Sequence, residues 1–183
     1  MRRLFLVRHA PTDATRRAAF PEDEALDERA RQQAAALAAR LPRGPEAMSS
    51  PALRCRETAL AAGLDPTPDP LLAECDFGAW AGRSLAEIED DAARAWMTDP
   101  DAAPHGGESL TAFAGRVAGW LDAQAERDGS AVAVTHAGVV KGALVHALGA
   151  PLESFWRIDV TPLAITELHA HDGRWTVARV NDL

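Results

Sequence analysis

A chain of 183 residues is long enough to bury a two- or three-layer core, and it fits a single domain spanning residues 1–183. Hydrophobic residues make up 47% of it and charged residues 25%, which excludes a disordered or fibrous protein. The net charge of −8 argues against a general nucleic-acid binder, which is usually basic, but it allows a locally basic pocket for a small anion.

The N-terminus has no signal peptide pattern, because only four apolar residues, 4–7, precede Arg8. No apolar run approaches the roughly 20 residues that a membrane helix needs. We therefore expect a cytoplasmic protein without membrane contact, in which Cys55 and Cys75 are reduced thiols. Two cysteines are too few for a zinc site, and His169 and His171 lack a third ligand, so we expect no metal and no other cofactor.

The first half of the chain alternates strands and helices. Residues 3–8 are a short apolar run that predicts a buried strand. Apolar residues at helical spacing predict a helix over 27–41, with Asp27 as its N-cap. A second short strand is expected at 46–49, and Pro51 opens a helix that runs to about residue 62.

The second half continues the alternation after a loop at 65–70 and an irregular segment at 71–80. A short helix is expected at 84–97 and a strongly amphipathic one at 108–127. The apolar run 131–135 predicts a buried strand, followed by a helix at 138–148. A hairpin closes the chain, with strands at 163–169 and 175–180 around Asp172-Gly173. This alternation predicts an α/β fold, with a mostly parallel central sheet.

Two histidines occupy similar places in this pattern. His9 and His136 each follow the end of a predicted buried strand, and ligands of α/β sheets bind at the carboxyl ends of strands. Ala137 opens a helix directly after His136, and the unpaired N–H groups of a helix start attract anions. The sequence therefore indicates a phosphate pocket, although a strand-end histidine taken alone is as readily a surface turn.

Five segments, in order along the chain, strengthen this interpretation. They are Leu6–Thr12 (LVRHAPT), Ser49–Ala59 (SSPALRCRETA), Leu72–Gly82 (LAECDFGAWAG), Gly106–Ser109 (GGES) and Val134–Val140 (VTHAGVV). Together they resemble the signatures of the histidine phosphatase (phosphoglycerate mutase-like) superfamily. The resemblance implies a three-layer α/β/α sandwich and a metal-independent phosphohydrolase.

The resemblance also implies roles for individual residues. His9 would be the nucleophile that becomes phosphorylated, and Arg8 and Arg54 would clamp the phosphoryl oxygens, which a planar guanidinium suits. His136 would donate to the same oxygens. Glu74 would protonate the leaving alcohol and then activate water.

Other residues are expected to contact the substrate. Thr15 stands where the family often has Asn and could donate a hydrogen bond, and Ala137 and Glu108 are expected at the pocket wall. For Glu108, a place at the start of the following helix without a role in the pocket is an open alternative. Arg16 and Arg17 could reach the substrate, but solvated loop positions are equally consistent. Trp80 is a candidate wall of the pocket. Cys55 and Cys75 adjoin site residues, and inert buried thiols are favoured over a redox switch.

The chain departs from the family pattern at several positions. Ala10 replaces a glycine that would allow close backbone approach or a positive φ. Residues 20–27 lack the glycine that usually occurs in that segment, Ala81 replaces a usual glutamate, and Lys141 replaces a usual arginine. Ala10 leaves a catalytically weak phospho-ligand binding module as an alternative function, whereas Lys141 keeps the positive charge of the usual arginine.

A compact segment joins Glu74 to His136, which favours a phosphatase over the alternative of a phosphoglycerate mutase, whose insert there is usually longer. The expected partner is a small phosphomonoester. The GGES segment and the short length are most similar to α-ribazole phosphatases, so α-ribazole 5′-phosphate is a candidate substrate. The sequence leaves the oligomeric state open, a homodimer included.

Overall fold

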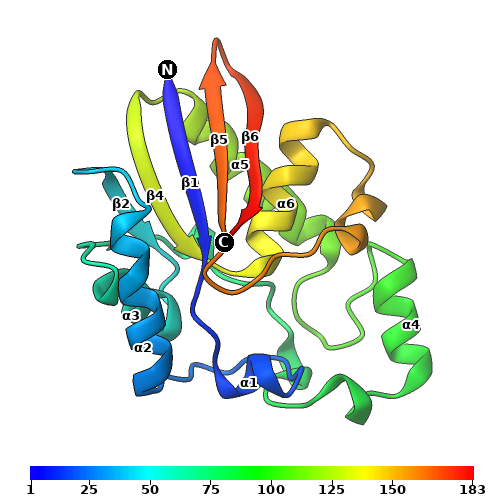
Figure 1. Cartoon of the computed structure of the whole chain (residues 1–183). Coiled ribbons are helices and arrows are strands. Elements are labelled where there is room, and N and C mark those ends of the chain that lie inside the picture. The colour runs from blue at the N-terminus through cyan, green and yellow to red at the C-terminus, as the bar shows by residue number, and fades with distance from the viewer.

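A computed structural model describes residues 1–183 and shows a six-stranded sheet between two layers of helices (Figure 1). The strands are β1 (Arg2–Arg8), β2 (Glu46–Ser49), β3 (Thr67–Pro68), β4 (Gly129–Thr135), β5 (Ile165–His171) and β6 (Arg174–Asp182). Their order is β3-β2-β4-β1-β5-β6. The first four are mutually parallel, and β5 and β6 add an antiparallel hairpin. The expected three-layer α/β fold with a mostly parallel sheet is confirmed.

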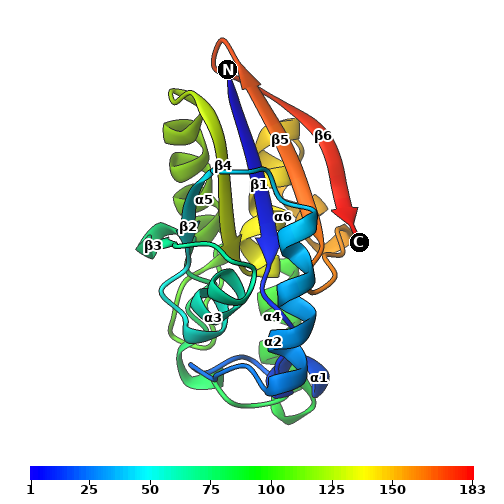
Figure 2. The ribbon, with the colours of Figure 1, turned by 60° about the vertical axis from the view of Figure 1, so that its left-hand side comes forward.

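The helices cover both faces of the sheet. They are α1 (Asp13–Arg16), α2 (Glu28–Ala35), α3 (Leu53–Ala61), α4 (Asp90–Thr98), α5 (Leu110–Ala125) and α6 (Ala137–Leu148), with 3-10 turns η1 (Ala36–Ala39), η2 (Pro70–Leu72), η3 (Gly78–Trp80), η4 (Leu85–Glu87) and η5 (Leu152–Arg157). Figures 1 and 2 show α2 and α3 on one face and α5 and α6 on the other. None of these helices is long and apolar enough to span a bilayer.

The central strand β1 explains why helices are needed on both faces. Successive side chains of a strand point to opposite faces. Leu4 and Leu6 therefore pack into the core beneath α5 and α6, whereas Phe5 and Val7 pack into a second core beneath α3. All four are buried, and burying each such side chain contributes about 1.5–3 kcal/mol.

Several element boundaries differ from the sequence-based expectation. Asp27 caps α2 as predicted, its carboxylate accepting the Ala30 amide at 2.7 Å, but the helix tightens into η1 after eight residues. The helix expected at 84–97 breaks at Ile88, which is extended because its side chain packs with Phe20 and Trp80. Within the expected loop 65–70, β3 pairs with β2. The short elements α1 and η5 had no clear periodic signal.

The topology brings loops from distant parts of the chain to one edge of the sheet. The parallel strands β1 and β4 are neighbours, with Arg8 opposite Thr135 in the register. Both run downward in Figure 1, toward α1 and α4. The residues that follow these strands therefore meet at that edge, as expected for ligand sites of parallel sheets.

Candidate active site

The two strand-end histidines lie next to each other. The amide of His9 donates to the carbonyl of Thr135 at 2.9 Å, so the chain leaves β1 alongside the end of β4. The ring planes of His9 and His136 are inclined by 68°, and the ring centroids are 5.3 Å apart. Both side chains are almost completely buried. The structure therefore places these two predicted site residues side by side.

The tautomer of His9 follows from its hydrogen bonds. Its Nδ1 lies 2.7 Å from the carbonyl oxygen of Ala10, and because a carbonyl only accepts, Nδ1 carries the proton. Nε2 therefore holds a lone pair, to which Nε–H of Arg54 donates at 3.3 Å. Burial first, and then the charge of Arg54, lower the pKa of His9 to about 3. The imidazole is neutral and nucleophilic at ordinary pH.

Arg54 connects both histidines. It lies in the first turn of α3, is buried, and donates through Nη2 to Nδ1 of His136 at 3.1 Å. Nε2 of His136 lies 2.8 Å from the hydroxyl of Ser50, and burial is the main cause that lowers the pKa of His136. A third N–H group of Arg54 donates to the carbonyl of Glu22 at 2.7 Å. The guanidinium is thus oriented by both histidines and by the loop after α1.

Arg8 approaches the same site from the end of β1. Its guanidinium donates to the carbonyl of Val160, and its Nε–H is buried without a partner. Burial lowers the pKa of Arg8, opposed by the charges of Glu74 and Asp159. A buried N–H group without a hydrogen-bond partner costs free energy. An anion bound at the site would accept a hydrogen bond from Nε–H of Arg8 and remove that cost.

Glu74 reaches the site from the irregular segment after η2. Its two oxygens accept the amides of Cys75 at 3.0 Å and of Gly138 at 3.2 Å. Burial raises the pKa of this carboxyl, opposed by those two amides and by Arg54 and Arg8. A Cβ at position 138 would lie 2.1 Å from one oxygen, so only glycine fits there beside Glu74.

Three hollows meet at Glu74. We call the first the histidine pocket, about 170 Å³, lined by Arg8, His9, Thr15, Glu24, Glu74, His136, Ala137 and neighbouring residues. The acidic cleft, about 390 Å³, is lined by Glu22, Asp23, Ser50, Arg54, Glu74, Asp76, His136 and others. The aromatic pocket, about 170 Å³, is lined by Glu74, Phe77, Trp96, Phe113, Lys141, Phe155, Trp156 and others. Glu74 belongs to the wall of all three.

Of the three residues predicted to contact the substrate, two line a pocket and one does not. Thr15 and Ala137 line the histidine pocket. Glu108 does not line any of the three hollows, because Arg116 holds both of its oxygens at 2.9 and 2.8 Å. Arg116 also donates to the carbonyl of Glu74 at 3.3 Å. Glu108 therefore supports the segment that carries Glu74.

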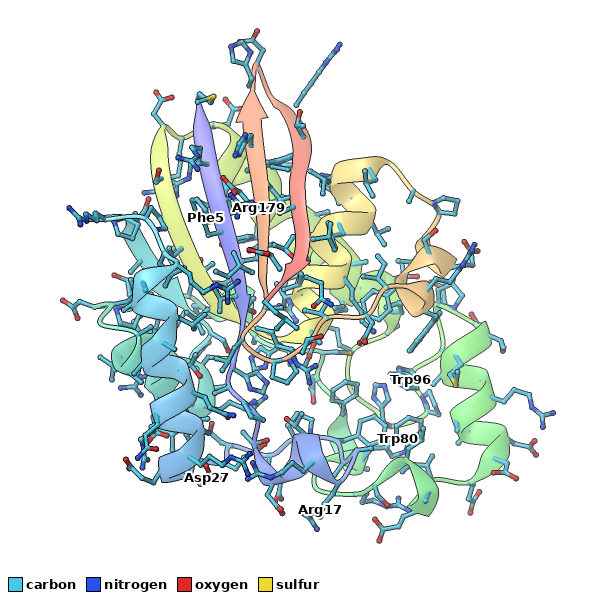
Figure 3. The ribbon with its side chains drawn as sticks, in the orientation of Figure 1. Phe5, Arg17, Asp27, Trp80, Trp96 and Arg179 are labelled. Atoms are coloured by element: carbon cyan, nitrogen blue, oxygen red, sulfur yellow. The ribbon has the colours of Figure 1, made fainter.

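The remaining candidates lie outside the pocket walls or are inert. Arg16 and Arg17 form exposed ion pairs with Asp27 and Asp13, and Figure 3 shows Arg17 pointing away from the sheet. Trp80 is buried against Phe20 and lines none of the three hollows.

The thiols and the remaining histidines have no evident reactive role. Burial raises the pKa of Cys55, and it raises that of Cys75 to about 12, which disfavours a reactive thiolate. No group of three or more potential metal ligands is present. His169 pairs with Glu167 on β5, at the register position opposite Arg3 and away from the site.

Sequence reasoning missed two residues next to the site, Ser50 beside His136 and Glu24 beside Arg54. Ser50 follows β2 and fixes His136, and it stands inside the Ser49–Ala59 segment, so its place in the motif could have indicated it. Glu24 comes within 3.8 Å of Arg54 and accepts the Thr12 hydroxyl at 2.9 Å. Nothing in the sequence distinguishes Glu24 from the other acidic residues of its loop.

The family model of the histidine phosphatase superfamily, branch 1, matches residues 4–183. Because the match covers nearly the whole chain, the chain belongs to this superfamily.

The relatives include a bifunctional protein of Mycobacterium tuberculosis, 33% identical over 195 residues. That alignment covers 98% of this chain but 53% of the relative, so the chain spans about half the length of such proteins. A proposed phosphoserine phosphatase of Hydrogenobacter thermophilus is 29% identical over 196 residues, which cover 100% of this chain and 97% of that protein.

A solved structure of mycobacterial glucosyl-3-phosphoglycerate phosphatase in complex with VO3 superposes on this fold with a TM-score of 0.86. It is 29% identical, and the match covers 100% of both chains. The relatives whose names state a substrate are phosphatases of glucosyl-3-phosphoglycerate and of phosphoserine. The expected closer similarity to α-ribazole phosphatases is not supported.

Proposed function

We propose that this histidine phosphatase superfamily member hydrolyses small phosphomonoesters through a phosphohistidine at His9. One observation carries the proposal. The neutral imidazole of His9 has its Nδ1–H fixed by the Ala10 carbonyl, so that its Nε2 lone pair lies among cationic groups at the histidine pocket. A phosphoryl group bound by Arg8 and Arg54 would present its phosphorus to that lone pair.

In the first step, Nε2 of His9 attacks phosphorus, an N–P bond forms, and the P–O bond to the leaving alcohol breaks. Glu74 gives its proton to the departing oxygen, and the burial that raises its pKa favours the protonated form needed for this role. Arg54 donates to Nε2 in the structure. Its Nε–H must therefore turn to a phosphoryl oxygen before the attack.

His136 contributes as a cation in this scheme. Its Nδ1 accepts a hydrogen bond from Arg54, so it can donate to a phosphoryl oxygen only once Nδ1 is protonated. The negative charge of a bound phosphate favours that protonation. The developing charge on the equatorial oxygens is then shared by two arginines and an imidazolium.

In the second step, Glu74 is a carboxylate and removes a proton from water, which attacks phosphorus. The N–P bond breaks, inorganic phosphate leaves, and the electron pair returns to Nε2 of His9. The protein groups supply all the positive charge and proton transfer that both steps use, so the proposed route needs no metal ion.

The substrate class follows from the named relatives. Phosphoserine and glucosyl-3-phosphoglycerate are both phosphomonoesters of an alcohol that also bears an acidic group, and we propose a substrate of this kind. α-Ribazole 5′-phosphate loses its support, because the expected similarity to its phosphatases was not found.

The test is to trap the intermediate. Enzyme mixed with a phosphomonoester labelled with ³²P and quenched in alkali, where phosphohistidine survives, should retain label at His9. The variant His9→Ala should retain neither label nor turnover, whereas His146→Ala, which removes a histidine next to Asp122 at the far end of α6, should keep both.

Product analysis separates the alternatives. Release of inorganic phosphate supports the phosphatase. Transfer of phosphate between positions of phosphoglycerate would indicate a mutase, and binding without turnover would indicate a ligand-binding module. Full activity in His9→Ala would refute the proposed nucleophile.

A further inference from the structure

The aromatic pocket opens beside the proposed acid. It shares Glu74 and Ala137 with the histidine pocket, so a group that leaves phosphorus near Glu74 can lie in it. Its walls come from the segment 74–77 and from α4, α5, α6 and η5, parts of the fold that lie far apart in the sequence. This arrangement places a preformed hollow where the alcohol part of a substrate has to go.

Five of the eleven residues that line the aromatic pocket carry aromatic rings. Trp96 packs against Trp156 with ring centroids 4.7 Å apart, Trp156 against Phe155 at 5.3 Å, and Phe155 against Phe113 at 6.3 Å. Trp96 is fixed from its other side by Trp80 at 5.7 Å, and Figure 3 shows these two rings together next to α4. Edge-to-face stacks of this kind hold rings in place, so the hollow is built before any ligand arrives.

One cation faces this pocket. Lys141 on α6 is the only lysine of the chain, and its Nζ lies 5.3 Å from the centroid of the Phe155 ring. It has no carboxylate within 4.0 Å and makes no hydrogen bond to the protein. Burial lowers its pKa, opposed by the charges of Asp159 and Glu74. A half-buried ammonium without a partner gains most from an anion that enters the pocket.

The acidic cleft has the opposite character. Glu22, Asp23 and Asp76 line it, and its one cation, Arg54, is oriented toward the two histidines and belongs to the proposed phosphate clamp. An acidic group on the alcohol would be repelled there and attracted in the aromatic pocket.

We propose that the aromatic pocket receives the alcohol part of the substrate and that Nζ of Lys141 pairs with a carboxylate on it. A single ammonium matches the single charge of a carboxylate. This inference rests on the proposed phosphatase function and adds to it the site that selects the leaving group. Lys141 is then a specificity-determining residue.

The experiment compares substrates that differ only in the carboxylate. One pair is 3-phosphoglycerate and glycerol 3-phosphate, and the other is benzyl phosphate with and without a 4-carboxylate. For each pair we define the preference as the ratio of kcat/KM for the ester with a carboxylate to kcat/KM for the ester without one. Lys141→Met should lower this preference about 10- to 100-fold in at least one pair, mainly through KM, the range that a charged hydrogen bond supplies.

Two further variants complete the test. Lys141→Arg should restore most of the preference. Arg127→Met removes one positive charge from an exposed ion pair with Glu46 and should leave the preference as in the parent protein. If Lys141→Met lowers kcat/KM equally for both members of both pairs, or for neither, the inference is overturned while the phosphatase function stands. If the parent protein hydrolyses none of the four esters nor p-nitrophenyl phosphate, the proposed function itself fails.

Discussion

Gly138 gives a direct way to move the proposed acid without altering it. The residue lies in the first turn of α6, and a Cβ there would stand 2.1 Å from Oε1 of Glu74, where ordinary contact begins at 3.4 Å. In Gly138→Ala the oxygen therefore has to shift by about 1.3 Å. The ring of Phe113, 3.1 Å from the same Cβ, limits how far α6 can move instead.

The expected cost depends on the leaving group. Misplacing a catalytic group by about 1 Å costs on the order of 100-fold in rate. Alkyl phosphates need a proton on the departing oxygen, so kcat/KM for phosphoserine should fall about 100-fold. p-Nitrophenolate leaves readily without a proton, so kcat/KM for p-nitrophenyl phosphate should change by less than about five-fold.

The assay is steady-state kinetics with both esters, together with thermal unfolding of each variant. Gly119→Ala is the matched control, because it makes the same change in helix α5 with no atom within 4 Å of the new Cβ. Glu74→Gln should reproduce the substrate contrast and, with p-nitrophenyl phosphate, add a burst of about one nitrophenolate per site. An equal loss with both esters in a folded Gly138→Ala protein would refute the assignment of Glu74 as the acid.

Three further predictions follow from the site. His9 is neutral in the fold with a pKa of about 3, whereas in the unfolded chain it binds a proton below about pH 6.5, so the free energy of unfolding falls as the pH drops through that window. His9 alone should account for about 2 kcal/mol of the loss by pH 5, and His136, whose pKa is also lowered, adds to it. In denaturant titrations, His9→Gln should therefore make the dependence on pH less steep. Ala10→Gly should keep kcat/KM but lower the free energy of unfolding by about 1–2 kcal/mol. The variant loses the buried methyl group that packs against Ala30 and Ala34, and residue 10 does not need a glycine because its φ is not positive. An unchanged free energy of unfolding would contradict this packing. Activity should survive EDTA and be inhibited by vanadate, and a loss in EDTA that added metal restores would count against the mechanism.

The sequence by itself determined the frame of the site. The apolar runs that form β1 and β4 are short, and a histidine follows the end of each strand, so parallel pairing brings His9 and His136 to one edge of the sheet. The Ser49–Ala59 segment placed Arg54 in the first turn of α3, where a side chain can reach the same edge. These features are local or follow from topology, and periodicity together with family resemblance is enough to predict them.

Only the tertiary structure decided which partners hold these groups and which hollows they line. Glu108 and Glu74 are both glutamates in family motifs, but Arg116 engages both oxygens of Glu108, whereas two amides hold Glu74 at the junction of three hollows. Ala10 looked like a defect in its motif, yet α2 packs against its methyl group.

The aromatic pocket shows the same limit more clearly. Its stacked rings come from α4, α5 and η5. The sequence predicted the start of α4 too early, because Ile88 is extended and packs with Phe20 and Trp80 instead of continuing a helix. No local pattern places Lys141 beside Phe155. Contacts between segments far apart in the chain depend on tertiary packing. Hydrophobic periodicity in the sequence predicts helices and strands, but it does not predict which of them come into contact.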